Sequence, residues 1–546
     1  MPFNKSKLLI AAVAIACTGT VAVLVYLRTL RVQVYRPEES AKLVPDEALM
    51  ATFISPDSSS LQYLKRFGTR QTRNQLDRIL SNFKRQSLAG MPLDFDRDLK
   101  PWMGGLMVSV LPPENPDQGE DSHLLMILAI RNRFKASQLA NRLNSQTGIQ
   151  HQGRDYRGIT ISQYIEESGK RYSIATIGDR VLVAATAWPI ERAIDTLRGE
   201  PSLADVWGSE DLFFDDIAVP NPLMTIFIAD YAGFVEQTAE LSGESWRSWD
   251  AVSRLTPVES VAIGVGVDGE GLRLKGVMRL QPPPTPPGPP PEVGELVARF
   301  PSETIALINS QGIDRIWSQL VAGAPENPSV RDFVRRVRRG LEALDLDADG
   351  AVFGWMDGEF ALGAIASDDG ILAPLGLGGV LVVETSDRPQ AEATLDQLDA
   401  IVAESNPPVD VERRTIQGVE VTEWNDPEQG TLFGHGWLTP DTLFVAFGGP
   451  VVETITLVPN PTLPENPRFQ SITESLPQAN HSYVYLDMEH LVYWATGYLL
   501  AAPAVAVEPK TFTLLNSIRG VGISAARPTT DRIEIEVLLA LKPKRN

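Results

Sequence analysis

Cysteine is nearly absent from this chain, which contains one cysteine, Cys17, among 546 residues. A single thiol forms no internal disulfide and no thiolate metal site, so neither kind of cross-link stabilises the fold. Cys17 itself lies inside an apolar run that continues beyond it. We therefore interpret it as a small apolar residue of that run rather than as a lipid-attachment site.

Positive charge is also scarce, because 69 acidic residues outnumber 49 lysines and arginines and give a net charge of −20. An acidic surface repels the phosphate backbone, which removes the electrostatic basis of nucleic-acid binding. We therefore expect no nucleic-acid partner.

Common catalytic motifs are missing, including the G-x-S-x-G elbow, H-E-x-x-H and the P-loop. Gly264, Gly266 and Gly269 form a G-x-G-x-x-G string. The string runs from a predicted strand into a hairpin, so no helix N-terminus follows it to receive a phosphate. Ser81 and Lys84 form S-x-x-K without the downstream S-D-N and K-T-G partners, which favours a solvated helix face.

Histidines are few and scattered, at His123, His151, His435, His481 and His490. The spacing of His481 and His490 does not match the i, i+4 pair that binds a metal from one helix. His435 lies between two glycines in a predicted turn. We interpret all five as structural histidines.

Alternating aspartates precede a tryptophan in both halves of the chain, at Asp345, Asp347 and Asp349 and at Asp94, Asp96 and Asp98. With Gly350, the group at 345–349 matches the first half of a calcium loop, but the required acidic twelfth position is Met356. Two interpretations stay open. The groups are either weak cation sites or turns whose aspartates cap backbone amides, and the turn is favoured.

A long apolar run is present near the N-terminus, over residues 8–27. Twenty uncharged residues at about 1.5 Å each reach about 30 Å, the thickness of the bilayer hydrocarbon. The run predicts a transmembrane signal anchor between a short basic tail, residues 1–7, and a juxtamembrane segment, residues 28–42. Flanking charges do not set the orientation, but long domains translocate largely regardless of charge, so we expect an extracytoplasmic body in the periplasm or thylakoid lumen.

The rest of the chain contains one long internal repeat. The segment PDEALMATFIS from Pro45 matches PSETIALINS from Pro301, and PWMGGLMVSV matches GWMDGEFALG, which pairs Trp102 with Trp355. Both tryptophans are predicted to lie in a core. We place the first α+β repeat at residues 43–280, a proline-rich linker at 281–292 and the second repeat at 293–543.

Each repeat reads as strands with interspersed helices. Residues 261–267 and 272–280 alternate around Asp268-Gly269, which predicts a β-hairpin. Helical spacing appears from Ile190 to Leu197 and from Leu395 to Val402, the latter after Asp387 as a start signal. The predicted class is α+β: two tandem homologous domains, each a largely antiparallel sheet with packed helices, plus one N-terminal transmembrane helix.

The segments LVPDEALMATFISPDSSS and DLKPWMGG, together with the duplicated halves, carry a resemblance. The chain resembles an uncharacterised, mostly cyanobacterial family, the domain of unknown function numbered 3352. The resemblance implies a membrane-attached protein of the cell envelope or thylakoid. It implies no activity and assigns no functional residue.

These observations favour a non-enzymatic binding or scaffold protein with a protein or lipid-like partner, touching the membrane through residues 8–27. The alternative is a hydrolase with a dispersed carboxylate or metal site. No catalytic, cofactor-binding or metal residue is assigned and no cofactor is expected. Clustered Asp, Glu and His in a deep polar pocket would favour the hydrolase, whereas an apolar groove or an exposed sheet would favour binding.

Overall fold

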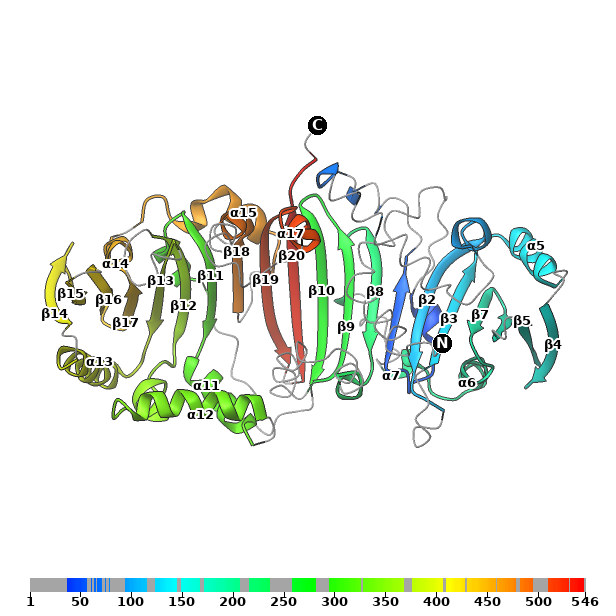
Figure 1. Cartoon of the computed structure of the whole chain (residues 1–546), viewed down its shortest axis with the longest axis horizontal. Helices are drawn as coiled ribbons and strands as arrows, with labels where there is room; N and C mark the ends of the chain where they lie inside the picture. Colours follow the sequence, from blue (N-terminus) through cyan, green and yellow to red (C-terminus); the bar gives the residue numbers. More distant parts are fainter. Residues whose placement is uncertain are drawn as a thin grey trace. The chain divides into compact units, whose positions relative to one another are not determined.

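The chain divides into two compact units, one containing strands β1–β10 and the other β11–β20 (Figure 1). The computed structural model describes residues 37–55, 60, 63–64, 66–70, 74, 78, 94–114, 123–144, 149–166, 171–206, 216–235, 258–280, 294–325, 328–367, 376–405, 409–427, 430–457, 459–477, 482–493, 509–529 and 531–544. The predicted tail (1–7), anchor (8–27) and linker (281–292), together with Cys17, Ser81, Lys84 and His481, lie outside these residues.

The first unit is built on one antiparallel sheet. Its strands, in order across the sheet, are β10 (Gly271–Leu280), β9 (Val258–Val267), β8 (Pro222–Ile228), β1 (Met50–Ile54), β2 (Met103–Leu111), β3 (His123–Ile130), β7 (Arg180–Ala184), β6 (Arg171–Ile177), β5 (Ile159–Glu166) and β4 (Ile149–Tyr156). Its helices are α2 (Pro37–Ala41), η2 (Phe95–Leu99), α5 (Arg133–Asn144), α6 (Trp188–Leu197) and α7 (Leu203–Val206).

Both faces of this sheet are covered. On one face Ile190 and Ile194 of α6 join Met107 and Ile127 of the strands in a single buried cluster. The predicted helical spacing from Ile190 is thereby confirmed. On the other face Trp102 packs with residues of β2, β3 and α5. The middle strands β1 and β2 are therefore buried along their whole length.

The second unit contains strands β11–β20. Its strands, in order across the sheet, are β20 (Arg532–Leu541), β19 (Ile518–Thr529), β18 (Ser482–Asp487), β11 (Thr304–Gln311), β12 (Glu359–Ala366), β13 (Leu377–Glu384), β17 (Thr442–Phe447), β16 (Gly430–Trp437), β15 (Val419–Asp426) and β14 (Asp410–Ile416). Its helices are η5 (Leu296–Arg299), α11 (Ile313–Gly323), α12 (Pro328–Glu342), η6 (Ala348–Val352), α13 (Arg388–Ala403), α14 (Gly449–Thr456), η8 (Leu463–Glu465), α15 (Pro467–Thr473) and α17 (Pro509–Leu515).

One face of the second unit's strands is fully packed, whereas the other is packed where α13 covers it. Phe300, Val452 and Ile472, from η5, α14 and α15 and their flanks, pack on the core residues Leu307 and Phe444 of the strands. The predicted helix near Leu395 is confirmed as α13, whose first turn is capped because the side chain of Asp387 accepts from the amide of Gln390 at 3.1 Å.

The two units have the same order of strands. Each strand of the first unit therefore has a counterpart in the second, β11 for β1, β12 for β2 and so on. The predicted hairpin at Asp268-Gly269 joins β9 to β10 and is confirmed. A Cβ atom at Gly264 would overlap the carbonyl oxygen of Ile217, and one at Gly266 would overlap that of Pro220. These glycines therefore admit a close backbone crossing and do not form a phosphate loop.

The predicted fold class needs correction. Strands hold more residues than helices among the described residues, and every strand pair described is antiparallel, so the fold is sheet-rich with helices as covers. The α+β prediction gave the helices too large a part, because amphipathic spacing shows that a helix forms but not how much of the core it supplies. The domain bounds 43–280 and 293–543 stay predictions. Helix α2 lies in the segment predicted as juxtamembrane, and its Ala41 is buried in the core.

The predicted transmembrane helix is the second correction. Among the helices that the structure describes, none combines the length and hydrophobicity needed to cross a bilayer. This finding contradicts the prediction of a single-pass membrane protein with an extracytoplasmic body. The prediction rested on the length and lack of charge of residues 8–27, which lie outside the residues that the structure describes.

Candidate functional site

One face of the second unit's sheet carries apolar side chains that are open to solvent. Ile308 on β11 and Leu362 on β12 lie directly opposite each other and are 42% and 45% exposed. Residues opposite one another in neighbouring strands point to the same face. The adjacent residues Leu307 and Ala361 point to the other face and are fully buried. Both faces are thus apolar, and at Ile308 and Leu362 only one of them is covered. Nearer to α13, the face of Leu362 is covered as well, since Phe360 and Val383 are buried with Leu395 of that helix.

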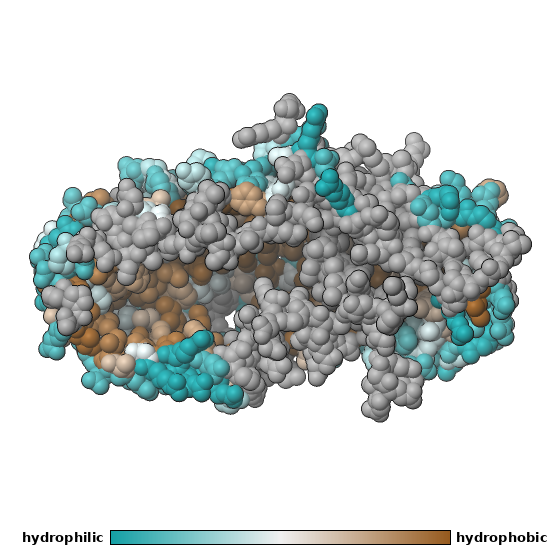
Figure 2. Space-filling view, viewed as in Figure 1, coloured by the Kyte–Doolittle hydropathy of each residue, from teal (hydrophilic) through white to brown (hydrophobic). Residues whose placement is uncertain are grey.

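The strand register extends this surface across five strands. We call the surface the apolar hollow and define it by two cross-strand rows: Val484, Ile308, Leu362, Leu381 and Val445, and Leu486, Ala306, Ala364, Gly379 and Phe447. Figure 2 shows hydrophobic residues gathered in a recess on this side of the second unit, beside the hydrophilic helix α12. A solvated face of an antiparallel sheet is usually polar, so this surface departs from the common pattern.

Small residues make the surface concave. The first unit places Met50, Val110 and Leu124 at the positions that Ala306, Ala364 and Gly379 occupy in the second. Met50 and Val110 are 2% and 4% exposed, because that face of the first unit is filled and covered. Replacing three large side chains by two alanines and a glycine removes volume at the middle of the sheet. The loss of volume is confined to this row, because in the neighbouring row the larger Ile308 and Leu362 stand where the first unit has Thr52 and Val108.

Aromatic rings close one side of the hollow. Phe447 meets Phe433 of β16 edge to face at 5.5 Å, and Phe433 stacks on Trp424 of β15 at 4.2 Å between ring centroids. The strand pairing puts the three rings on the hollow's face of the sheet. Offset and edge-to-face pairs of this kind stabilise one another beyond simple burial, so the three rings form one packed wall.

A buried carboxylate supports this wall from helix α13. Asp399 accepts a hydrogen bond from Trp424 Nε1 at 2.7 Å, and its Oδ1 lies 3.0 Å from His435 Nε2. Burial alone would raise the pKa of Asp399, but the hydrogen bonds from His435 and Trp424 lower it overall. The carboxylate is therefore ionised at neutral pH. Sequence reasoning missed this site, since it treated His435 as part of a turn and gave Asp399 no role.

Helix α12 forms a rim of the hollow. Its buried side packs on α11, and an ion pair holds it to the turn at η6. Val330 and Val334 pack on Trp317 of α11. Arg338 donates to Asp349 at 2.6 Å, and Trp317 Nε1 donates to the same carboxylate at 2.7 Å. Hydrogen bonds from Trp317 and Arg338 outweigh burial and lower the pKa of Asp349. A charged anchor therefore holds the helix to the turn at η6.

The aspartates of the predicted half calcium loop do not converge on one point. Asp347 accepts from the amide of Gly350 at 2.7 Å, as the turn interpretation predicts, whereas Asp349 faces Arg338. Asp345 has a positive φ of 54° and offers its carbonyl oxygen to Gln397. Within the part of the chain that the structure describes, no group of three or more His, Cys, Asp or Glu side chains is placed to hold a metal.

The matching turn in the first unit is held by an ion-pair cluster. Asp98 is buried and accepts from the amide of Asp94 at 2.8 Å and from Arg97 at 3.0 Å, and it also pairs with Arg142. Burial alone would raise its pKa, but these donors lower the pKa of Asp98 to about 2. The side chain of Asp96 lies outside the described residues.

The paired tryptophans make the same contact in both units. Trp102 Nε1 donates to the carbonyl of Asp98 at 2.6 Å, and Trp355 Nε1 donates to that of Ala351 at 2.9 Å. Both side chains are buried in hydrophobic clusters, at 3% and 4% exposure. Their predicted place in the core is confirmed.

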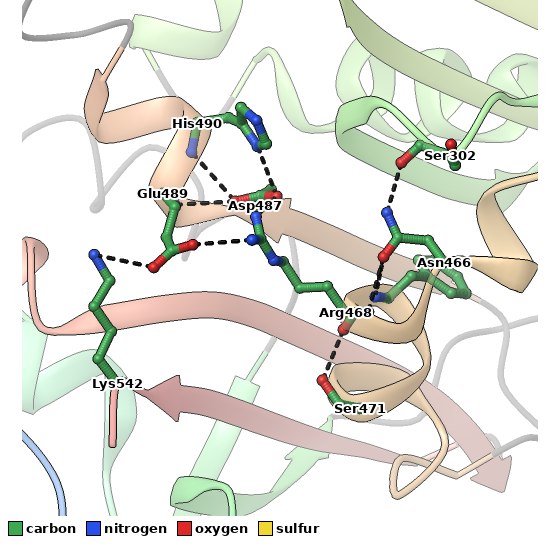
Figure 3. Close-up of polar contacts among 9 residues, drawn as sticks. Ser302, Asn466, Arg468, Ser471, Asp487, Glu489, His490 and Lys542 are labelled. Carbon is green, nitrogen blue, oxygen red and sulfur yellow. Dashed lines mark hydrogen bonds and ion pairs between the residues drawn. The ribbon is translucent and has the colours of Figure 1, made fainter. Parts of the chain in front are cut away.

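A second polar cluster surrounds Asp487 at the end of β18 (Figure 3). Asp487 is buried and accepts from Arg468 Nη1 at 2.5 Å and from the ring of His490 at 2.8 Å. Glu489 forms ion pairs with Arg468 at 3.0 Å and with Lys542 at 3.3 Å. Burial alone would raise the pKa of Asp487, but His490 and Arg468 lower it overall.

The cluster resembles part of a catalytic triad, but among the described residues no hydroxyl takes the place of a nucleophile. Ser471 donates to the carbonyl of Arg468 at 2.9 Å, and Ser302 accepts through its carbonyl from Asn466 at 2.6 Å (Figure 3). No serine or threonine hydrogen bond to His490 is found among the residues with a described structure. Through Arg468, the arrangement ties α15 to the end of β18.

Replacing Asp487 by asparagine should lower the free energy of unfolding by about 2 kcal/mol at pH 7, because Arg468 loses its charged acceptor. The lowered pKa means that this contribution is full above the unfolded-state value of about 3.9 and is lost as the pH falls through the folded-state value. Urea unfolding of both proteins from pH 7 to pH 3 measures the difference. A difference in the free energy of unfolding that stays constant down to pH 3 would contradict the assignment. Ser471→Ala is the control and should leave the free energy of unfolding nearly unchanged.

The remaining histidines are separate from these clusters. His123 on β3 packs against Trp188, with ring centroids 5.1 Å apart. His151 lies on β4, and its side chain is outside the described part of the structure. The structure does not bring the described histidines together.

Comparisons with known proteins add a family and a weak structural likeness. A family model described as a protein of unknown function (DUF3352) matches residues 8–541. No curated protein matches the chain. Crystal form III of TP0453 is 8% identical, with a TM-score of 0.26 over 44% of this chain and 79% of that one. Crystal form IV gives 7% identity and a TM-score of 0.26 over 44% and 83%. Scores this low support no conclusion about fold or function.

Proposed function

The chain belongs to the DUF3352 family of proteins of unknown function, and from this premise we propose that it is a non-enzymatic binding protein. Its second unit holds an apolar partner in the hollow. One observation carries the proposal: Ile308 and Leu362 lie side by side at the centre of a sheet face, nearly half exposed, where a folded sheet would normally be covered or polar.

The surroundings of the hollow support a binding role. A ligand site is typically concave and mostly apolar, with a few polar groups that fix orientation. The hollow has an apolar floor and a wall that includes Phe433 and Trp424, held by the ionised Asp399. Rigid aromatic walls give large contact areas at little cost in conformational entropy.

The polar clusters favour binding over the alternative hydrolase. His435 and His490 each face a carboxylate that is already engaged by Trp424 or Arg468. Asp399 and Asp487 therefore complete hydrogen-bond networks that join helices to strands.

A neutral fluorescent hydrocarbon probe, N-phenyl-1-naphthylamine, tests the proposal directly. The folded protein should bind it saturably, and Leu362→Asp should weaken binding at least tenfold, because a carboxylate would have to be desolvated in the hollow. The matched control is Leu457→Asp, since Leu457 is also 45% exposed but lies beyond α14, outside the hollow.

Melting temperatures of both variants should stay close to that of the wild type, since both positions are exposed. Two results would overturn the proposal. The first is an absence of saturable binding, and the second is binding that Leu362→Asp and Leu457→Asp affect equally.

A further inference from the structure

Helix α12 is strongly basic although the chain as a whole carries a net charge of −20. Its 15 residues include five arginines, at Arg331, Arg335, Arg336, Arg338 and Arg339. Only Asp332 and Glu342 offset them within the helix. A positive segment in an acidic protein attracts anions locally and repels cations.

Two of these arginines are engaged within the protein. Arg338 is bonded to Asp349, and Arg335 pairs with Asp332 at 2.6 Å on the exposed surface. Arg331, Arg336 and Arg339 are exposed, and none of them forms an ion pair with any residue that the structure describes. Val330 and Val334 pack the helix against Trp317, and Arg339 lies on the opposite side while Arg331 and Arg336 lie on the two flanks, all three in solvent.

The basic helix and the apolar hollow are adjacent. Figure 2 shows α12 as a hydrophilic border along the recess of hydrophobic residues in the second unit. Across the hollow, the row from Val484 to Val445 spans four strand spacings of about 4.8 Å, or about 19 Å. Leu381 and Val445, at one end of this row, pack against the cluster of Trp355 and α13, so the open floor is centred on Ile308 and Leu362. The site therefore offers an apolar floor with a cationic edge.

We propose that the ligand of the hollow is a single-chain amphiphile with an anionic headgroup, whose chain lies on the apolar floor and whose carboxylate or phosphate meets the arginines of α12. This inference rests on the proposed binding function. The planar guanidinium fork matches carboxylate and phosphate oxygens in a bidentate manner. A concave floor fits one chain taken up as a monomer, whereas a bilayer surface is flat and would touch only the rim.

Isothermal titration with four ligands tests the inference on the full chain: dodecyl phosphate, laurate, dodecyl maltoside and dodecyltrimethylammonium, each below its critical micelle concentration. Dodecyl phosphate and laurate should bind at least tenfold more tightly than the maltoside at low ionic strength, and the trimethylammonium compound most weakly. The advantage of the anions should shrink as salt is added.

The double variant Arg336→Gln, Arg339→Gln should bring dodecyl phosphate to within about threefold of the maltoside and leave maltoside binding unchanged, because a rim charge acts on the headgroup alone. The matched control is Arg133→Gln, Lys135→Gln, which removes two exposed positive charges from α5 in the first unit. This control should leave the anion preference intact.

The outcomes separate this inference from the proposed function. Equal binding of anionic and neutral amphiphiles, or an anion preference that survives the α12 substitutions, would overturn the inference while the neutral-probe result stands. Inorganic phosphate binding as tightly as dodecyl phosphate would also overturn it, as would binding only to vesicles of anionic phospholipid. Failure of all four ligands together with the neutral probe would overturn the binding function itself.

Discussion

Truncating Phe444 to alanine should destabilise the second unit by about 3–5 kcal/mol, the range for removing a fully buried phenylalanine. Phe444 on β17 has no exposed surface and lies in the cluster that includes Val380 and Ala446. Its ring also approaches Gly436, where a Cβ would come within 2.9 Å of it. The cavity left by the truncation has little room to collapse, because strands enclose it on both sides.

The matched control for Phe444→Ala is Leu362→Ala on the opposite face of the same sheet. Leu362 is 45% exposed, so its truncation should cost no more than about 1 kcal/mol. Hydrogen exchange of peptides from β12 and β17, read as opening free energies, measures both variants in the same unit. Equal losses of stability in Phe444→Ala and Leu362→Ala would contradict the distinction between the core and the hollow.

Replacing Asp399 by alanine should cost about 3 kcal/mol, because the indole of Trp424 and the ring of His435 would both lose a buried acceptor. Asp399→Asn keeps an acceptor oxygen and should cost clearly less. The ordered aromatic wall should also loosen in the alanine variant, which Trp424 fluorescence and hydrogen exchange of β15 would report.

The control for Asp399→Ala lies one turn earlier on the same helix. Asp396 is exposed and forms a surface ion pair with Arg413 at 3.2 Å, so Asp396→Ala should cost about 0.5 kcal/mol or less. If both alanine variants were equally stable, Asp399 would be no more than a surface charge. The stabilising network assigned to it would then be wrong.

Much of the local structure follows from short-range patterns in the sequence. Asp268 accepts from the amides of Glu270 and Gly271, which explains why Asp-Gly between alternating strands predicted the hairpin. Asp387 caps α13 as its position predicted. The prediction that Trp102 and Trp355 lie in cores held because each precedes a buried strand. These features depend on neighbours within a few residues.

The hollow could not be predicted in the same way. Strands β12 and β13 are apolar on both faces, a pattern that also fits strands buried on both sides. Which face is covered depends on helices far away in the chain, and no local pattern records that choice. The only usable signal is the change from Met50 and Val110 to Ala306 and Ala364 between matched strands.

The polar sites were missed for a related reason. Asp399 and His435 are 36 residues apart, and Arg468 and Asp487 are 19 apart, so each pair forms only through the strand order. In contrast, the aspartates grouped by sequence at 345–349 face different partners. Closeness in the sequence suggested one site where the fold separates the side chains.

Cysteine accessibility tests most directly whether the hollow is open, because a Cys17→Ser background would leave no other thiol. In that background Leu362→Cys should react with a maleimide in native buffer nearly as fast as after denaturation, and dodecyl phosphate should slow the reaction. Ala361→Cys, on the buried face of the same strand, should react only after unfolding. A native Leu362→Cys that is as unreactive as Ala361→Cys would contradict an open apolar hollow.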